Sequence, residues 1–192
     1  LRRFDSAIAN STNTADLARR AGVARGRISV VHPGTSVSPE QAMPGRQPVA
    51  ASDQGEGPIL LSVGRLTERK GLVQFITHAM PLIVAEHPHA RLVVGGDDAP
   101  NALRKGAGDP SRDLLAAIDS AGMQRHVLRL GPCSDEELAK AYERAAVHVF
   151  PVRHVPGDVE GFGMVAIEAA AHGLPTVAFA VGGVPDAVSD GV

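Results

Sequence analysis

Five short apolar runs alternate with helix-like segments between residues 59 and 180, and this alternation constrains the fold more than any other feature. The runs are ILLSVG (59–64), RLVVGG (91–96), HVLRL (126–130), VHVFPV (147–152) and TVAFA (176–180). Helical patterns lie between them at 72–87, 111–122, 134–146 and 163–173. Mostly uncharged strands that alternate with helices are typical of a parallel sheet covered on both faces. The sequence therefore predicts an α/β fold with a doubly wound parallel sheet.

Residues at the ends of the expected helices support these boundaries. Ser134 and Glu137 have the spacing of a capping box at the start of a helix. Gly122 and Gly173 stand where left-handed C-terminal residues are expected. Pro81 lies inside the 72–87 pattern, and we expect it to kink that helix or to restart it.

The first third of the chain has a different character. A short amphipathic helix is expected before Gly22, followed by a strand that runs into a turn at 27–34. Residues 33–58 are rich in Pro, Gly, Ser and Gln, and 97–110 in Pro, Gly and Asp, so both predict surface loops. The chain begins at Leu1 without Met and stops after a turn-like SDGV. We therefore expect an excerpt of a longer protein, cut at both ends.

Composition excludes several classes of function. The net charge of -2 and the absence of Trp give no support to nucleic-acid binding. Cys133 is the only cysteine, which rules out an internal disulfide and a cysteine-based zinc cluster. No run approaches the ~18 apolar residues of a membrane span.

The loop after the first core strand, GRLTERKG from Gly64 to Gly71, carries two cations at the expected ligand end of the sheet. Arg65 can bind a phosphate in a bidentate manner, and Lys70 adds a point charge. The following helix start favours anionic oxygens. This combination predicts a diphosphate site without P-loop spacing. Two solvated surface cations are the alternative.

The loop after the fourth strand, RHVPGDVEGFGMV, leads into the last helix with Glu160 before it and Glu168 inside it. Gly161 and Gly163 allow a ligand to approach the backbone. At ~1.5 Å rise per residue the two carboxylates could lie roughly 10 Å apart, which suits two hydroxyl-bearing ends of one sugar nucleotide. The alternative is that Glu168 caps a backbone group or pairs with an arginine.

Together, VGRLTERKG, LGPCSDEELAKAYERA, and Glu-x7-Glu with EGFG before EAAAHGLPTVAFAVGGVPDAV resemble the C-terminal, donor-binding domain of retaining GT-B glycosyltransferases (family 4-like, group 1). The resemblance covers about Ile28 to Val192. It implies a Rossmann-like sheet, the C-terminal half of a GT-B fold. It also implies that residues 1–27 are the end of an N-terminal acceptor domain and the crossing, and that 28–192 are a nucleotide-sugar-binding domain truncated at its C-terminus.

Residue roles follow from this resemblance alone. Arg65 and Lys70 would hold the donor diphosphate beside Gly64, with Glu160 as the third catalytic residue. Glu168 would bind the ribose hydroxyls. The transferred sugar and distal phosphate would contact Glu160 and the backbone of Gly161, Phe162, Gly163 and Met164. Residues near the base would be Cys133 and Asp135, and Cys133 departs from the aliphatic residue common there.

The implied reaction is glycosyl transfer with retention, from a GDP-mannose-like donor in preference to a UDP-sugar, with no metal and no cofactor. The acceptor is left open among a sugar, a lipid-linked glycan and a small molecule, and the missing N-terminal domain is the expected partner. We expect this piece alone to bind donor but to transfer nothing.

Two other functions are alternatives to glycosyl transfer. A non-catalytic nucleotide-binding module is compatible with the same residues. An NAD-type oxidoreductase requires Gly-x-Gly-x-x-Gly after a strand, and neither VGRLTERKG nor GGDDAPNALRKGAG has that spacing. The expected location is the cytoplasm, with the inner face of the membrane as an alternative for the full-length enzyme.

Overall fold

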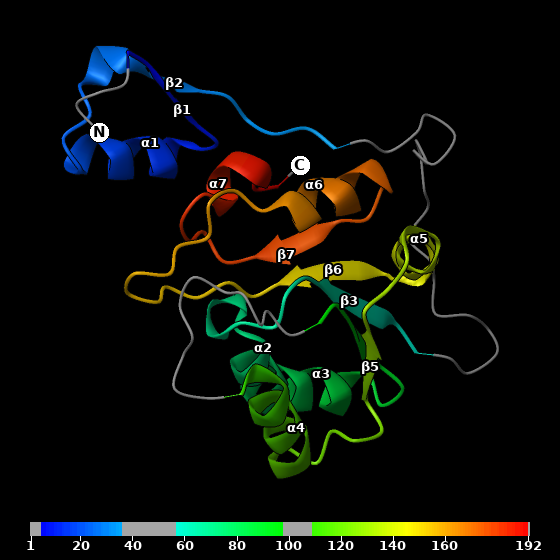
Figure 1. Cartoon of the computed structure of the whole chain (residues 1–192). Coiled ribbons are helices and arrows are strands. Elements are labelled where there is room, and N and C mark those ends of the chain that lie inside the picture. Colours follow the sequence, from blue (N-terminus) through cyan, green and yellow to red (C-terminus); the bar gives the residue numbers. More distant parts are fainter. Residues whose placement is uncertain (1–4, 36–56, 98–108, 192) are drawn as a thin grey trace.

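A five-stranded, all-parallel sheet forms the centre of the molecule (Figure 1). The structure is a computed structural model that describes residues 5–35, 57–97 and 109–191. The strands are β3 (Ile59–Val63), β4 (Arg91–Gly95), β5 (Val127–Gly131), β6 (Val147–Phe150) and β7 (Thr176–Ala178). Their order is β5-β4-β3-β6-β7. The predicted α/β class and all five predicted strands are confirmed. Most residues of the two loops predicted at 33–58 and 97–110 lie outside the described residues.

Helices cover both faces of this sheet, as the doubly wound prediction requires. One face carries α2 (Leu72–Gln74), α3 (Met80–Glu86) and α4 (Pro110–Ser120), as Figure 1 shows. The opposite face carries α5 (Asp135–Arg144), α6 (Met164–Ala171) and α7 (Val184–Ala187). Separate apolar clusters lie on the two sides of the sheet: Leu60 and Leu92 belong to one, and Leu61 belongs to the other with Tyr142 of α5. Successive strand residues therefore face opposite layers.

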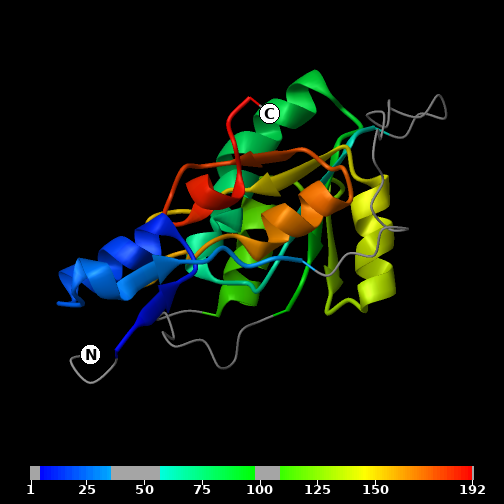
Figure 2. The same ribbon diagram turned by 90° about the horizontal axis from the view of Figure 1, so that it is seen from above.

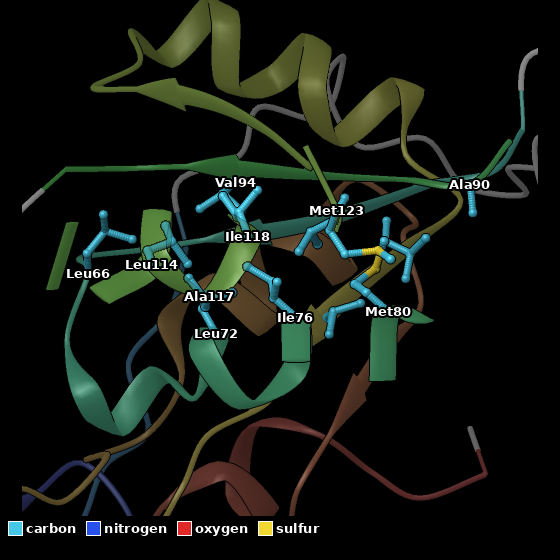
Figure 3. Close-up of a cluster of buried hydrophobic side chains, with 13 residues drawn as sticks. Leu66, Leu72, Ile76, Met80, Ala90, Val94, Leu114, Ala117, Ile118 and Met123 are labelled. Carbon is cyan, nitrogen blue, oxygen red and sulfur yellow. The ribbon is translucent and has the colours of Figure 1, made fainter. Parts of the chain in front are cut away.

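The first cluster fills the space between the sheet and α2–α4 (Figure 3). Ile76, Met80 and Leu92 have no solvent-accessible surface, and Leu114 and Ile118 close the cluster from α4. Truncating such a side chain to Ala costs about 2–5 kcal/mol. This dry layer holds β3 rigid up to its carboxyl end, where the candidate site begins.

The predicted helix at 72–87 is divided into three segments. A π-helical stretch, η3 (Phe75–Ala79), separates α2 from α3, and Pro81 lies in the first turn of α3. Proline lacks the N–H that would bond four residues back, so the backbone widens just before it. The predicted restart near Pro81 is confirmed.

Helix caps follow the local sequence. The capping box of Ser134 and Glu137 is complete at the start of α5. Gly122 and Gly173 follow α4 and α6 with φ of 69° and 68°, which is the left-handed conformation that favours glycine. These boundaries are fixed by short-range chemistry, which is why the sequence predicted them.

The first described residues form a small unit of their own. Strand β1 (Ala7–Ala9) pairs in parallel with β2 (Ile28–Val30), and α1 (Thr12–Arg20) connects them. Figures 1 and 2 both place this unit beside α7. Since a division at 27/28 would separate two paired strands, we propose that the domain boundary lies after Val30.

The strand order fixes where a ligand can bind. The chain winds outward from β3 to β4 and β5, then returns to place β6 on the other side of β3. In such sheets the crevice lies at the carboxyl ends of the strands where the winding reverses. The residues after β3 and after β6 therefore border one crevice.

Candidate functional site

The loop after β3 is held close to the end of β4. The N–H of Gly64 donates to Gly95 at 3.0 Å, and a Cβ on Gly96 would overlap the carbonyl of Gly64. The loop then forms a 3-10 turn, η2 (Glu68–Lys70), before α2. Lys70 returns over Gly64, where an added Cβ would lie 3.5 Å from the lysine Cε. The structure thus places the side chain of Lys70 beside Gly64.

Glu160 comes from the loop after β6 and lies buried opposite that turn. Its carbonyl accepts the N–H of Gly183 at 2.9 Å. A Cβ on Gly182 would lie 2.5 Å from the same carbonyl oxygen. The segment before α7 therefore fixes the backbone of Glu160 and leaves its carboxylate to face the β3 loop.

Lys70 and Glu160 form an ion pair across the crevice. The Nζ atom of Lys70 donates to Oε2 of Glu160 at 2.8 Å, and the side chains are 12% and 10% exposed. The same ammonium lies 4.6 Å from the ring centroid of Phe150, a cation–π contact at the end of β6. The structure therefore brings together two predicted site residues from separate loops.

Several charges act on the ammonium of Lys70. Burial lowers its pKa from the usual range, and the nearby charges of Arg69 and Arg65 act in the same direction, while Glu160 opposes them. Arg65 is exposed, and its effect on the pKa of Lys70 indicates that it is near the pair. A cation site that is locally crowded with positive charge favours an incoming polyanion.

Arg69 is a site residue that the sequence reasoning missed. Its side chain is buried, with Nε 3.3 Å from Oδ1 of Asp158 and Nη2 3.7 Å from Oε2 of Glu160. Its Nη1 donates to Oγ1 of Thr67 at 3.1 Å. The sequence places Arg69 directly before Lys70, so its position was a clue to its role. Only the fold shows that the side chains of both Arg69 and Lys70 turn inward.

Glu168 lies in α6, half-buried, and Tyr142 of α5 holds its carboxylate. The Tyr142 hydroxyl donates to Oε2 of Glu168 at 3.3 Å. Burial raises the pKa of Tyr142, and the charge of Glu168 raises it further, so the phenol stays a neutral donor. The ring of His172 stacks on Tyr142 at 5.0 Å. The sequence reasoning did not single out Tyr142.

The glycine-rich turn between the two glutamates contacts the N-terminal unit. The carbonyl of Gly161 accepts from Oγ1 of Thr14 at 3.4 Å. Phe162 is buried and lies against the ring of His32 at 5.4 Å. Gly163 adopts φ of 117° at the start of α6, and Met164 is exposed. The sequence resemblance predicts that the backbone of this turn contacts a sugar. Its large buried side chain, Phe162, instead packs against His32.

Cys133 and Asp135 lie farther along the same edge. Cys133 follows β5, where its thiol donates to the carbonyl of Gly131 at 3.3 Å. A Cβ on Gly95 would lie 3.7 Å from its Sγ, so Cys133 reaches the end of β4. Asp135 is exposed in the first turn of α5. Cys133 thus lies on the side of β4 and β5, where the strand order continues away from β3.

Two kinds of site are not found in the part of the chain that the structure describes. No group of three or more His, Cys, Asp or Glu side chains lies close enough to hold a metal ion among these residues. Within 5–35, 57–97 and 109–191, the helices are too short or too polar to span a bilayer.

Solved structures with the same fold are GT-B glycosyltransferases. Sucrose-phosphate synthase from Thermosynechococcus elongatus has a TM-score of 0.73 and 30% identity, over 96% of this chain and 43% of that one. HepE from Anabaena, solved with UDP and glucose, has a TM-score of 0.73 and 22% identity, over 100% of this chain and 48% of that one. The Rossmann-like, GT-B fold is confirmed.

Sequence comparisons identify the family. A D-inositol 3-phosphate glycosyltransferase from Mycobacterium sp. (strain JLS) is 36% identical over 174 residues, covering 86% of this chain and 35% of the relative. One from Streptomyces avermitilis is 33% identical over 199 residues, covering 97% and 39%. The chain thus spans little more than a third of these relatives. The family model for glycosyl transferases group 1 matches residues 47–192. The chain belongs to the glycosyl transferases group 1 family.

Proposed function

We propose that this chain is the donor-binding domain of a retaining glycosyltransferase and that it takes a nucleotide-diphospho-sugar. The observation that carries the proposal is the buried Lys70–Glu160 pair at the reversal of the sheet, with Nζ and Oε2 2.8 Å apart. A buried lysine offers its charge to phosphate oxygens, and a neighbouring carboxylate accepts hydrogen bonds from sugar hydroxyls. Family membership agrees with this chemistry.

The lysine has a specific role in this proposal. When donor binds, the diphosphate replaces Glu160 as the partner of Lys70, and exposed Arg65 supplies a second positive charge. As the sugar leaves, negative charge grows on the diphosphate oxygen. Preorganised cations stabilise that charge electrostatically. We therefore propose that Lys70 and Arg65 provide the charge stabilisation that a metal ion supplies in other transferases.

The two glutamates bind different parts of the donor in this proposal. Glu160, freed from Lys70, accepts hydroxyls of the transferred sugar. Glu168, held by Tyr142 at 3.3 Å, accepts the ribose hydroxyls. The base would lie toward Cys133 and Asp135. The preference for a GDP-mannose-like donor stays a prediction.

Retention at the anomeric carbon also belongs to the proposal. We propose a front-face displacement in which the leaving diphosphate helps to deprotonate the acceptor hydroxyl, as the sequence resemblance implies. The acceptor side would come from an N-terminal domain, so the 192-residue chain should bind donor without turnover. Turnover of a sugar nucleotide by this chain alone would contradict that part of the proposal.

Isothermal titration calorimetry of the 192-residue chain with GDP, UDP, ADP and NAD tests the donor site. We expect one nucleoside diphosphate to bind, with at least about tenfold loss in Lys70→Ala because a charge-assisted phosphate contact is removed. The matched control is Lys140→Ala, which removes an exposed lysine paired with Glu136 on α5. Added EDTA should leave the affinity unchanged. Binding of NAD alone, or equal losses in both variants, would overturn the proposal.

A further inference from the structure

Arg69 is more deeply buried than Lys70 and Arg65, the other two cations of the site. Its side chain is 8% exposed, and three of its nitrogen atoms each face a different oxygen-bearing side chain. Its carbonyl also accepts the N–H of Arg153 at 2.7 Å, which ties the η2 turn to the chain that leaves β6. Of the three side-chain contacts only that with Thr67 is a hydrogen bond, and Nε is buried without a hydrogen-bond partner among the described residues. A movement of Arg69 toward a ligand would break these contacts between the two loops.

Lys70 is held differently. Its single ammonium has one carboxylate partner, Glu160, and a cation–π contact with Phe150. Lysine carries its charge on a flexible four-carbon stem, so it can turn toward a phosphate. When it does so, Glu160, which is 8% exposed with Lys70 in place, loses its nearer counter-charge. A buried charge that is left without a partner is strongly destabilising.

We propose that Arg69 is the permanent counter-charge of Glu160, which keeps this carboxylate paired and oriented while Lys70 exchanges it for the donor diphosphate. The inference rests on the proposed function and adds a positioning residue to it. Asp158 adds a second carboxylate beside Arg69, with its Oδ1 3.3 Å from Nε of the guanidinium. Lys70 thus binds the diphosphate, while Arg69 stays paired with Glu160, the carboxylate that binds the sugar.

This division of roles predicts a selective defect. Removing Arg69 should weaken recognition of the sugar, which depends on a correctly oriented Glu160 carboxylate, more than recognition of the diphosphate, which depends on Lys70. A merely structural role for Arg69 would weaken both ligands alike. The measured quantity is therefore the ratio of the dissociation constants for a sugar nucleotide and for its parent nucleoside diphosphate.

The experiment is calorimetry of the 192-residue chain with GDP and GDP-mannose, and with UDP and UDP-glucose. In Arg69→Gln the ratio should shift about tenfold against the sugar nucleotide, while the affinity for the diphosphate stays within about threefold. Arg69→Lys, which keeps the charge but not the fork, should lie between Arg69→Gln and wild type. The control Arg144→Gln removes an exposed arginine at the end of α5 and should leave the ratio unchanged.

If Arg69→Gln does not fold, the same ratio of dissociation constants is measured in the charge-balanced double variant Arg69→Gln/Asp158→Asn. An unchanged ratio overturns the role of Arg69 alone. A wild-type chain that binds none of the four nucleotides overturns the proposed function itself.

Discussion

The Nζ atom of Lys70 lies 2.8 Å from Oε2 of Glu160, although 90 residues separate them in the chain. Each is largely buried, so each serves as the counter-charge that the other needs. An anionic ligand that binds Lys70 must therefore compete with a carboxylate of the protein itself. Removing the charge of Lys70 should therefore weaken nucleotide binding, and removing the charge of Glu160 should strengthen it.

Glu160→Gln should bind the nucleoside diphosphate more tightly than wild type, by about three- to tenfold. The substitution removes the negative charge that occupies Lys70 and repels the incoming phosphates. Calorimetry at two salt concentrations checks this, and the variant should show the steeper salt dependence. The control is Glu68→Gln, an exposed glutamate in the same loop as Lys70. Weaker binding of the diphosphate by Glu160→Gln would show that the carboxylate does not compete.

Tyr142→Phe should reduce the preference for a ribonucleotide over its 2′-deoxy analogue by about three- to tenfold. The change removes the hydroxyl that donates to Glu168 at 3.3 Å and leaves the ring stacked on His172. Stability should fall by only about 1 kcal/mol, the usual net contribution of one hydrogen bond. A double-mutant cycle with Glu168→Gln tests the coupling, and additive effects would contradict it.

His148 should make the chain less stable in mild acid. Burial, reinforced by the charge of Lys70, lowers its pKa from 6.5 to about 4 in the folded state. The unfolded chain therefore binds the extra proton first, and the stability present above pH 6.5 is lost as the pH falls toward 4. The loss is roughly 3 kcal/mol at most.

Urea unfolding of wild type and His148→Gln between pH 7 and pH 4 measures this loss. The glutamine keeps a polar group near Oγ1 of Thr176, which lies 3.1 Å from Nδ1 of His148, but it does not titrate. The free energy of unfolding of the variant should fall less steeply with acid. Parallel pH profiles would assign the acid sensitivity to other groups.

Gly71→Ala should destabilise the fold by at least about 2 kcal/mol. Gly71 has φ of 69°, and a Cβ there would overlap the carbonyl oxygen of Pro151. This close approach lets the η2 turn pack against the end of β6 and places Lys70 at the crevice. Thermal unfolding against Gly26→Ala, where a Cβ meets open space, isolates the effect. Equal melting temperatures would disprove the packing argument.

Much of the fold could be predicted because its signals are local. Apolar runs at 59–64 and 147–152 became β3 and β6, and Ser134 and Glu137 closed the capping box that their spacing predicts. The positive φ of Gly122 and Gly173 likewise depends on neighbouring residues only. Strand pairing could not be predicted in this way. The sequence assigned Ile28–Val30 to the second domain, whereas these residues form β2 and pair with β1 of the preceding segment.

The sequence by itself determined the alternation of strands and helices, the helix ends, the loops that carry Lys70 and Glu160, and the helix that carries Glu168. Only the tertiary structure decided which charges meet: that Lys70 faces Glu160, that Arg69 turns inward to Asp158, and that Tyr142 holds Glu168. The reason is physical. Helix and turn preferences come from interactions over a few residues, whereas ion pairs at a sheet edge depend on the strand order and on burial, which the whole chain sets together.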